Sequence, residues 1–257
     1  MSTQLRKEEI FRIALTAGEI LIRNGAEVVR TEETIHRICA SRGFFEASAF
    51  VSPTVIIIGN DEENGPSYVC NIKKRGNDLY RIMLINDFSR RFVKTPMSFD
   101  EAMKDLNAIV NATGYKNYVM ALGGSIGSSA FSLLIGSSPK DLLPCMITAF
   151  LCMIIMFRLD QKVFSVLLHL LLGVLIAIFG NLLTMIGFGQ NTDMIIIGAM
   201  LPFLPGIPFT NGVRDFMYGD LISGTSRMVE SVVLIVALSF GVGLVMNILH
   251  LIQGGFL

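Results

Sequence analysis

Residues 194–212 read MIIIGAMLPFLPGIPFTNG, an apolar run that three prolines interrupt. Pro202, Pro205 and Pro208 lie within seven residues, and Gly206 follows the second of them. An unbroken helix cannot accommodate them, because each proline lacks a backbone N–H and its ring clashes with the preceding turn. At about 1.5 Å per residue, the prolines lie near the middle of a bilayer. The run therefore predicts a broken membrane helix, which is either a transporter-like substrate site or a simple kink.

The composition of the whole chain indicates a membrane protein. Of its 257 residues, 52% are hydrophobic and 16% are charged, whereas a soluble domain carries about 25% charged residues. The 21 Lys and Arg balance 21 Asp and Glu, and the pI is about 6.8. Because no basic field is available to neutralise phosphates, nucleic-acid binding is not supported.

Charge is unevenly distributed along the chain, which locates a domain boundary. Residues 117–257 contain 5 Lys or Arg and 6 Asp or Glu, whereas the first 116 residues contain 16 and 15. We therefore predict an N-terminal cytoplasmic α+β domain over residues 1–114, followed by a five-helix transmembrane domain over residues 115–257. Each long uncharged stretch is a candidate span, because a membrane helix needs about 20 apolar residues. The predicted spans are about 117–137, 142–158, 163–186, 193–212 and 229–252.

The loops between the predicted spans indicate the orientation in the membrane. Lys and Arg concentrate before the first span and in the loops after the second and the fourth, and membrane proteins keep such loops in the cytoplasm. We expect a multi-pass protein of the cell (inner or plasma) membrane, with a cytoplasmic N-terminus and a C-terminus outside. Residues 1–23 are charged and amphipathic and lack a small-residue cleavage site, so no signal peptide is expected.

The polar half contains both helical and extended patterns. Apolar residues recur at helical spacing up to Asn24-Gly25, which offers a stop, and Thr31 is the expected N-cap of a second helix. β-Branched apolar stretches then predict three strands in an antiparallel meander. Ser98 and Glu101 form a capping-box pattern that opens a last helix. The expected helices are 10–22, 31–41 and 98–112, and the expected strands are 50–58, 67–72 and 79–85.

This polar half carries no recognised catalytic signature. It lacks the motifs of nucleotide-binding loops, serine hydrolases and zinc proteases, and its single histidine, His36, is expected on a helix surface. The cysteines of the chain form no C-x-x-C pair and have no histidine at metal spacing, so we expect them to be apolar filler. We therefore expect no enzyme, no cofactor and no metal site. The cysteines are Cys39, Cys70, Cys145 and Cys152.

One charged turn of the polar half is a candidate site. Glu27, Arg30 and Glu32 are close together in the sequence and directly follow Asn24-Gly25. The sequence leaves two interpretations open. The first is a solvated turn between helices that contains a local ion pair, and the second is a binding site.

The first predicted span is rich in small residues. Gly123 and Gly127 are four residues apart, as are Gly124 and Ser128, so each pair shares a helix face that another helix can approach closely. Tight packing and a polar pathway lined by hydroxyl groups are the two interpretations. Both place these residues inside the protein.

Polar and charged residues directly follow the broken helix. Arg214 offers a guanidinium fork that matches a carboxylate, and Asn211 can hydrogen-bond an amine or a hydroxyl. Asp215 and Asp220 could bind a cation or carry a proton. The alternative is a charged cytoplasmic loop in which Arg214 and Asp215 form an ion pair. His169 lies within the third predicted span, where it is either a functional ionisable group or a neutral histidine bonded to a neighbouring helix.

Two segments of the chain carry a family resemblance. The first is Asn24-Gly25-Ala26-Glu27 with Arg30-Thr31-Glu32, and the second reads P-G-x-P-x-x-N-x-x-R-D…G-D-x-x-S-G from Pro205 to Gly224. In both, the chain resembles the threonine/serine exporter (ThrE) family, and its length and layout resemble the larger, YjjP-like component of a split two-subunit exporter. The second five-span half of the fused exporters is not seen here, so the resemblance implies a separate partner similar to the smaller, YjjB-like five-span subunit.

The resemblance also implies a function. It is the export of small polar metabolites, either threonine and serine or dicarboxylates such as succinate, driven by the proton gradient. The working mechanism is alternating access, in which the partner closes the site. In this mechanism the break is shaped by Pro205, Gly206 and Pro208, the substrate is bound by Asn211 and Arg214, and the proton is carried by Asp215, Asp220 or His169.

Two other functions stay open. The cytoplasmic domain could be a ligand sensor or a hydrolase that the spans anchor, although it lacks a nucleophile motif. Tyr218-Gly219-Asp220 is similar to the G-x-G-D signature of intramembrane aspartyl proteases, which need two carboxylates. Met217 stands in the place of its first glycine, and no other span carries a mid-helix aspartate.

Overall fold

The chain forms two compact units in the computed structural model, which describes residues 5–60, 67–73, 75–160 and 162–252. The first unit comprises Met1–Gly114 together with Ile207–Val229. The second comprises Tyr115–Gly206 together with Glu230–Leu257. The segment 207–229, which follows the broken helix, therefore packs as part of the N-terminal unit.

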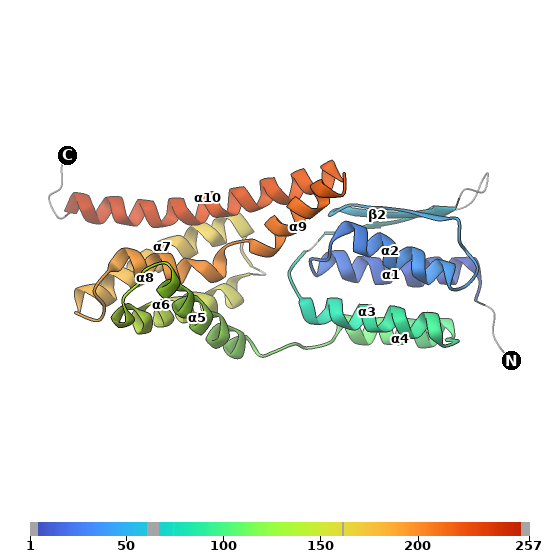
Figure 1. The fold of residues 1–257 in the computed structure, drawn as a ribbon, viewed down its shortest axis with the longest axis horizontal. Coiled ribbons are helices and arrows are strands. Elements are labelled where there is room, and N and C mark those ends of the chain that lie inside the picture. Colours follow the sequence, from blue (N-terminus) through green and yellow to red (C-terminus); the bar gives the residue numbers. More distant parts are fainter. Residues whose placement is uncertain (1–4, 61–66, 74, 161, 253–257) are drawn as a thin grey trace. The chain divides into compact units, whose positions relative to one another are not determined.

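Three layers build the N-terminal part of the first unit (Figure 1). The middle layer is formed by α1 (Lys7–Arg23) and α2 (Val28–Ala40), which pack against each other. A three-stranded sheet covers one side of this layer, and α3 (Leu79–Lys94) with α4 (Phe99–Val110) covers the other. The helices meet through large side chains that water does not reach, among them Phe11, Phe88 and Phe92.

The sheet consists of β1 (Ala47–Val51), β2 (Val55–Asn60) and β3 (Tyr68–Asn71), which pair antiparallel in the order β1-β2-β3. An antiparallel meander is therefore present, but not between the predicted strands: the stretch 50–58 is the β1–β2 hairpin and not a single strand, and only β3 matches a predicted strand, 67–72. The Ser52 hydroxyl accepts the backbone N–H of Val55 at 3.1 Å and closes the turn between β1 and β2.

The prediction of a strand over residues 79–85 is wrong, because these residues begin α3. Asp78 is the N-cap of this helix, and its carboxylate accepts the backbone N–H of Arg81 at 3.1 Å. Burial recurs at Ile85, Phe88 and Phe92, which are three and four residues apart. The apolar start alone looks extended, and only the pattern that continues beyond residue 85 identifies the helix.

The two predicted helix N-caps, Ser98 and Thr31, have different outcomes. Ser98 and Glu101 form the expected capping box at the start of α4. Thr31, in contrast, is not the N-cap of α2, because that helix begins one turn earlier with Glu27 in the cap position. The Thr31 hydroxyl lies inside the helix and donates to the carbonyl oxygen of Glu27 at 2.9 Å.

The second unit is a bundle of apolar helices. Its first two long helices, α5 and α6, make the most extensive contact, and α7 and α8 pack against α6. The helix α10 approaches α7 closely at Gly173, where a Cβ atom would collide with the carbonyl oxygen of Leu238. The elements of this unit are α5 (Asn117–Leu134), the 3₁₀ turn η1 (Pro139–Asp141), α6 (Leu142–Leu159), α7 (Ser165–Met185), α8 (Thr192–Met200), the 3₁₀ turn η2 (Leu201–Phe203) and the part of α10 (Leu221–Ile252) from Glu230 onward. The helix α9 (Gly206–Met217) and the start of α10 belong to the first unit.

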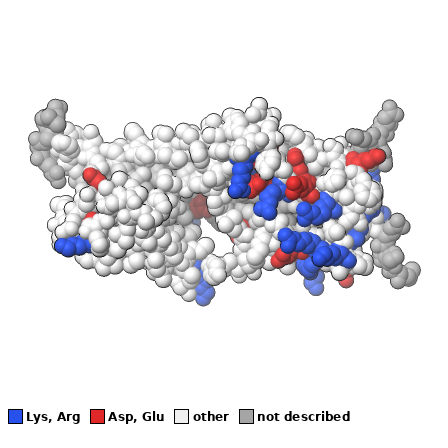
Figure 2. Space-filling view, viewed as in Figure 1, with Lys and Arg blue, Asp and Glu red and all other residues white. Residues whose placement is uncertain are grey.

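Several of these helices are long and apolar enough to cross a membrane. In the described parts of the chain there are three, namely Pro139–Leu159, Ser165–Met185 and Leu221–Ile252. The bent pair Thr192–Phe203 and Gly206–Met217 makes a fourth if it counts as one span. On the face shown in Figure 2, charged side chains gather over the first unit and leave the second almost uncharged. A membrane location is thereby supported, and the count of five spans stays a prediction.

The helix α5 has two different faces. Ser128 lies on the buried face, and Gly124 also faces inward, since a Cβ atom there would lie 2.7 Å from the Met153 side chain. The buried serines satisfy their hydroxyls within α5, as Ser132 does by donating to the carbonyl oxygen of Ser129 at 2.6 Å. Gly123 and Gly127 are exposed, with open space around them. The expected inside position therefore holds for one pair of small residues and not for the other.

Candidate functional site

The proline run breaks the helix as predicted. The first part, α8, continues into the 3₁₀ turn η2, Leu204 is extended, and α9 starts at Gly206 with a bend of 60°. Pro202 lies in the first turn of η2, and Pro208 lies in the first turn of α9. A first turn has no partner for its N–H groups, so prolines are tolerated there. Pro205 is buried at the break itself.

Beyond the break, α9 and the start of α10 form a tight helical hairpin. Gly219 turns the chain with φ +86°, and the Asp220 carboxylate caps α10 by accepting the N–H of Ser223 at 3.1 Å. The helices touch at two glycines. A Cβ atom at Gly212 would lie 3.2 Å from the carbonyl oxygen of Gly224, and one at Gly224 would lie 3.0 Å from that of Gly212.

The turn between α1 and α2 exposes backbone groups to this hairpin. Asn24 ends α1, and Gly25 has φ +89°, a conformation that side chains rarely allow. Glu27 is the N-cap of α2, but its side chain makes no capping hydrogen bond to the helix, so its carboxylate can bind another group. The Gly25 carbonyl accepts the side-chain amide of Asn211 at 2.8 Å, and the Ala26 carbonyl accepts Arg227 Nη2 at 2.8 Å.

A direct ion pair completes this contact. The guanidinium of Arg214 donates to the Glu27 carboxylate. The Glu27 side chain is 16% exposed and that of Arg214 is 58% exposed, so the pair lies at the rim of the structure and not in its core. The two segments that carried the family resemblance, which are far apart in the sequence, thus meet through side chains of α9 and the turn.

A cavity of about 220 Å³ lies between these elements. This volume is below the range of about 300–1,000 Å³ typical of sites for drug-sized ligands and suits a small metabolite. Its charged lining residues are Glu27, Arg30 and Arg214, and its apolar floor is formed by Leu21 of α1 and by Leu79 and Ile82 of α3. Its lining consists of Leu21, Gly25, Ala26, Glu27, Arg30, Leu79, Ile82, Asn86, Ile207, Thr210, Asn211 and Arg214.

The expected alternative of an ion pair between Arg214 and Asp215 is wrong. Adjacent residues point about 100° apart on a helix, because a turn takes 3.6 residues. Arg214 therefore reaches Glu27, while Asp215 points inward and lies 3.1 Å from Nε of Arg227. Asp215 and Arg227 are buried, with side chains 1% and 7% exposed.

Glu32 lies away from Glu27 and Arg30. It borders a second, open groove of about 710 Å³ between α2, β1 and α3, and its carboxylate accepts the N–H of Val51 at 3.3 Å. Burial raises the pKa of Glu32 above its ordinary 4.5; the Val51 hydrogen bond opposes this rise, and the nearby Asp220 and Asp215 carboxylates add to it.

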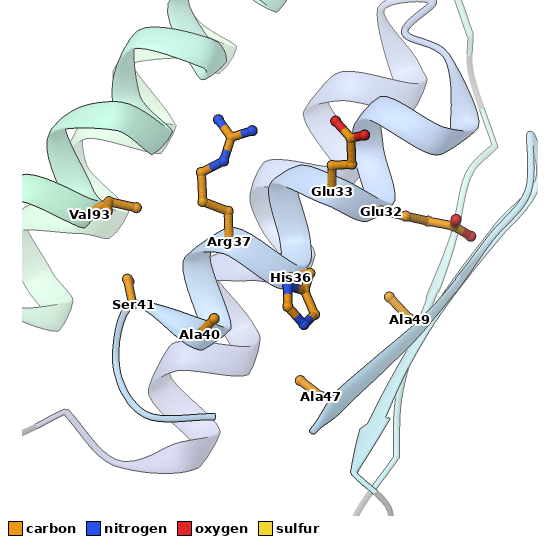
Figure 3. A pocket seen from close by; sticks show the side chains of 9 residues that line it. All are labelled: Glu32, Glu33, His36, Arg37, Ala40, Ser41, Ala47, Ala49 and Val93. Atoms are coloured by element: carbon orange, nitrogen blue, oxygen red, sulfur yellow. The ribbon is translucent and has the colours of Figure 1, made fainter. Parts of the chain in front are cut away.

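The second groove is mixed in character. Figure 3 shows His36 between α2 and β1, with Ala47 and Ala49 of β1 pointing toward it. One ring nitrogen of His36, Nε2, lies 3.2 Å from the carbonyl oxygen of Phe45 and is thus engaged in a hydrogen bond. His36 is exposed on α2, as expected.

Two further expectations concern positions outside the cavity. His169 lies in α7 of the second unit, where Nδ1 is 2.7 Å from the carbonyl oxygen of Ser165 on its own helix. Its hydrogen bond is therefore not to a neighbouring helix. Within the described ranges, no group of three or more His, Cys, Asp or Glu side chains could hold a metal ion.

A comparison with models of known protein families identifies the family of this chain. The model of the family described as "Putative threonine/serine exporter" (ThrE) matches residues 12–249. The chain belongs to the ThrE family. This match includes the turn after α1, the broken helix and the α9–α10 hairpin, so the ThrE cavity is built from segments inside the family region. ThrE is a transporter family, which supports a membrane location and a transport role over catalysis.

A more distant relative adds little about function. The chain is 24% identical over 173 residues to "Uncharacterized protein C16A10.01" of Schizosaccharomyces pombe, which covers 64% of the chain. The ThrE chain spans about a fifth of the length of this curated relative, namely 21%. No solved structure matches the chain.

Sequence reasoning found part of this ThrE site and missed part of it. Glu27, Arg30, Asn211 and Arg214 were candidates, and all four line the cavity. Arg227 was not a candidate, because it precedes the predicted span 229–252 and looks like a loop residue in the sequence; its burial depends on α10 starting already at Leu221. The apolar floor and Asn86 carry no sequence signal, because their position depends on how α1 and α3 pack.

Proposed function

We propose that this chain is a subunit of a secondary-active, proton-coupled exporter of small polar metabolites, either threonine/serine-like amino acids or dicarboxylates such as succinate. The observation that supports it is the cavity formed by α9, directly after the broken helix, and by the turn before α2. Membership of the ThrE family points to transport, and the cavity supplies groups that fit such substrates.

The chemistry of the lining favours anions and zwitterions. Arg214 and Arg30 can each bind a carboxylate, and the fork of a guanidinium allows two parallel hydrogen bonds. Glu27 can accept an ammonium group if Arg214 turns from it to the substrate. The amide of Asn211 is already used by the Gly25 carbonyl, so Asn211 orders the turn and offers its side-chain oxygen to the ligand.

The broken helix supplies a hinge for alternating access. Pro205 and Gly206 lie at the break, and the division between the two units falls directly after Gly206. Pro208 then begins α9, which carries Asn211 and Arg214. In the proposed cycle, rotation at the break moves α9 relative to α8, and a smaller five-span partner subunit closes the site.

Flux in proteoliposomes tests the proposal. Vesicles are loaded with radiolabelled threonine, serine or succinate, and release is measured with and without a pH gradient, for this chain alone and with a five-span partner. Release that depends on one substrate and on the gradient supports the exporter. Absence of release in every combination, with folded protein, contradicts it.

The role of Arg214 has its own probe. Arg214→Lys keeps the charge and loses the planar fork, so it should weaken flux markedly. Arg91→Lys is the matched control, because Arg91 lies on α3 in an exposed pair with Asp105 at 3.0 Å. Unaltered flux in Arg214→Lys would count against substrate binding by this residue.

One observation favours a second candidate function. The residues that line the cavity all belong to the first unit, which suits a ligand sensor that the membrane helices anchor. A sensor would bind a metabolite with Arg214-dependent affinity and show no flux. Binding without transport, under the conditions of the proteoliposome experiment, would favour it over the exporter.

A further inference from the structure

Arg227 joins three segments of the N-terminal unit. It lies in the first part of α10 and is only 6% exposed. Its Nη2 donates to the carbonyl oxygen of Ala26 at 2.8 Å, in the turn between α1 and α2. Its Nε lies 3.1 Å from the Asp215 carboxylate on α9. One guanidinium therefore ties α9, α10 and the turn together.

The glycine contact makes this reach possible. A Cβ atom at Gly212 would lie 2.9 Å from Cγ of Met228 and 3.2 Å from Cβ of Arg227, so α9 and α10 are as close as the backbone permits. Because the two helices nearly touch, the Arg227 side chain passes beside α9 and reaches the turn. A larger residue at position 212 would push it away.

The Ala26 carbonyl needs this donor. Ala26 is 6% exposed, and a buried backbone carbonyl without a hydrogen-bond partner is costly. The bond holds the residue directly before Glu27, whose carboxylate pairs with Arg214 across the cavity rim. The position of Glu27 therefore depends on a residue that does not line the cavity.

Asp215 supplies the matching charge. Both side chains of the pair are almost fully buried, at 1% for Asp215 and 7% for Arg227. A buried charge is stable only when an opposite charge or hydrogen bonds compensate it. The arginine keeps its proton in a protein, so Asp215 lies 3.1 Å from a fixed positive charge that favours the ionised form of its carboxyl group.

We propose that Arg227 is a positioning residue that holds Glu27 opposite Arg214, and that Asp215 is its counter-ion and not the carrier of the coupled proton. The inference rests on the proposed function, since it takes the cavity as the substrate site. It assigns a role to Arg227 and removes Asp215 from the candidates for proton coupling.

The first test is Arg227→Lys in the full chain. Lysine keeps the charge near Asp215 but lacks the second nitrogen that reaches Ala26. We expect faster backbone hydrogen exchange over residues 24–30 and a roughly tenfold higher KM for the transported substrate. The transport rate at saturating substrate should change less than about twofold, because the variant weakens substrate binding and leaves the steps after binding unaltered. Arg91→Lys should change neither quantity.

A purely structural role gives a different result. If Arg227→Lys lowers the melting temperature while KM and exchange over residues 24–30 equal those of the wild type, the positioning role is overturned. A second variant, which carries Arg227→Met together with Asp215→Leu, keeps the test valid when Arg227→Lys does not fold. Replacing a buried ion pair by apolar residues is often neutral for stability, yet the Ala26 anchor is lost. This variant should show the same rise in exchange and KM.

The counter-ion role of Asp215 is tested by Asp215→Asn. If Asp215 is a counter-ion, Asp215→Asn should leave the shape of the pH profile of flux unchanged and should raise hydrogen exchange over residues 24–30. Flux that no longer depends on the pH gradient, with exchange at the wild-type level, would overturn this part. If the wild type transports none of the three probe substrates, the proposed function fails; the hydrogen-exchange results still decide whether Arg227 positions the turn.

Discussion

At the scale of single residues, the site depends on which arginine pairs with the carboxylate of Glu27 and which with that of Asp215. Arg214 and Asp215 are neighbours in the sequence and would form a local pair on a solvated loop. In the structure, each finds a distant partner, Glu27 for the first and Arg227 for the second. The exposed pair lines the cavity and can exchange partners with a ligand, whereas the buried pair holds the hairpin in place.

The exposed pair gives a prediction about affinity. Glu27→Gln should raise the Kd of an amino-acid ligand roughly tenfold, because a hydrogen bond to a charged group is lost. Its effect on the free energy of unfolding should be small, since exposed ion pairs contribute little. Isothermal titration calorimetry with threonine measures the first and thermal unfolding the second. Glu19→Gln, which breaks the exposed pair with Arg23 at 3.2 Å, is the control and should leave Kd unchanged.

Glu32 gives a prediction about pH. Its folded-state pKa is raised above 4.5, chiefly by burial, so the folded chain holds this proton more tightly than the unfolded chain. The stability that this proton contributes is complete below pH 4.5 and is lost as the pH rises through the raised value. Glu32→Gln should therefore match the wild type at low pH and become the more stable of the two as the pH rises.

Thermal unfolding from about pH 4 to pH 7 measures this difference. The matched control is Glu33→Gln on the exposed side of α2, which keeps the Glu32 carboxyl group and should therefore keep the pH dependence that this group contributes. If the melting temperatures of wild type and Glu32→Gln stay parallel over the whole range, Glu32 does not titrate with a shifted pKa.

At the scale of elements, the close contact of α9 and α10 depends on small residues. Gly212→Ala would place a Cβ atom 2.9 Å from Met228, which the hairpin can relieve only by moving apart. We expect a loss of about 1–3 kcal/mol in the free energy of unfolding, the cost typical of overpacking, and weaker ligand binding because Arg227 is displaced. Gly123→Ala is the control, since nothing lies within 4 Å of its Cβ position.

Chemical denaturation and ligand titration of the two variants check this prediction. Gly123→Ala should be neutral or slightly stabilising, because alanine favours a helix more than glycine does. Equal stability and affinity in Gly212→Ala and the wild type would show that the hairpin tolerates the extra methyl group. In that case the glycine contact would not control the position of Arg227.

The helix α3 shows how an element is anchored at its start. Asp78→Ala removes the carboxylate that accepts the N–H of Arg81, and loss of such a cap costs about 1 kcal/mol. We expect a modest fall in melting temperature and faster hydrogen exchange in the first turn of α3. Asp87→Ala, an exposed change inside the same helix, should have almost no effect, and the opposite order would contradict the cap.

At the scale of the whole molecule, the division into units does not follow the chain. The segment 207–229 joins residues 1–114, although 92 residues of the second unit separate them. Removing residues 1–114 should therefore leave Asp215, Arg227 and Asn211 without their surroundings. We expect trypsin to cleave after Arg214 and Arg227 much faster in the truncated chain than in the full chain in matched membranes.

The control for this experiment is cleavage after Arg158, which lies in the second unit and should be equally fast in both chains. Equal cleavage at Arg214 and Arg227 would mean that the hairpin keeps its structure without the N-terminal segment. In that case, the contacts of residues 207–229 with the N-terminal segment would not stabilise the hairpin.

Local chemistry was sufficient to predict much of the fold. The apolar character of the second half, the break at Pro205 and the capping box at Ser98 depend on the residues themselves, because proline lacks a donor and a serine caps the turn that follows it. The antiparallel sheet followed from short turns between extended stretches. The membership of the ThrE family was also visible in two short motifs.

Tertiary structure alone decided the rest. Residues 79–85 look extended by themselves, and burial against α1 and α4 makes them helical. The partners of Glu27, Ala26 and Asp215 lie 187, 201 and 12 residues away along the chain, and no local periodicity encodes such distances. The sequence determined which chemical groups the protein carries and where its chain must bend; packing of the α9–α10 hairpin against the turn determined which of those groups share a cavity.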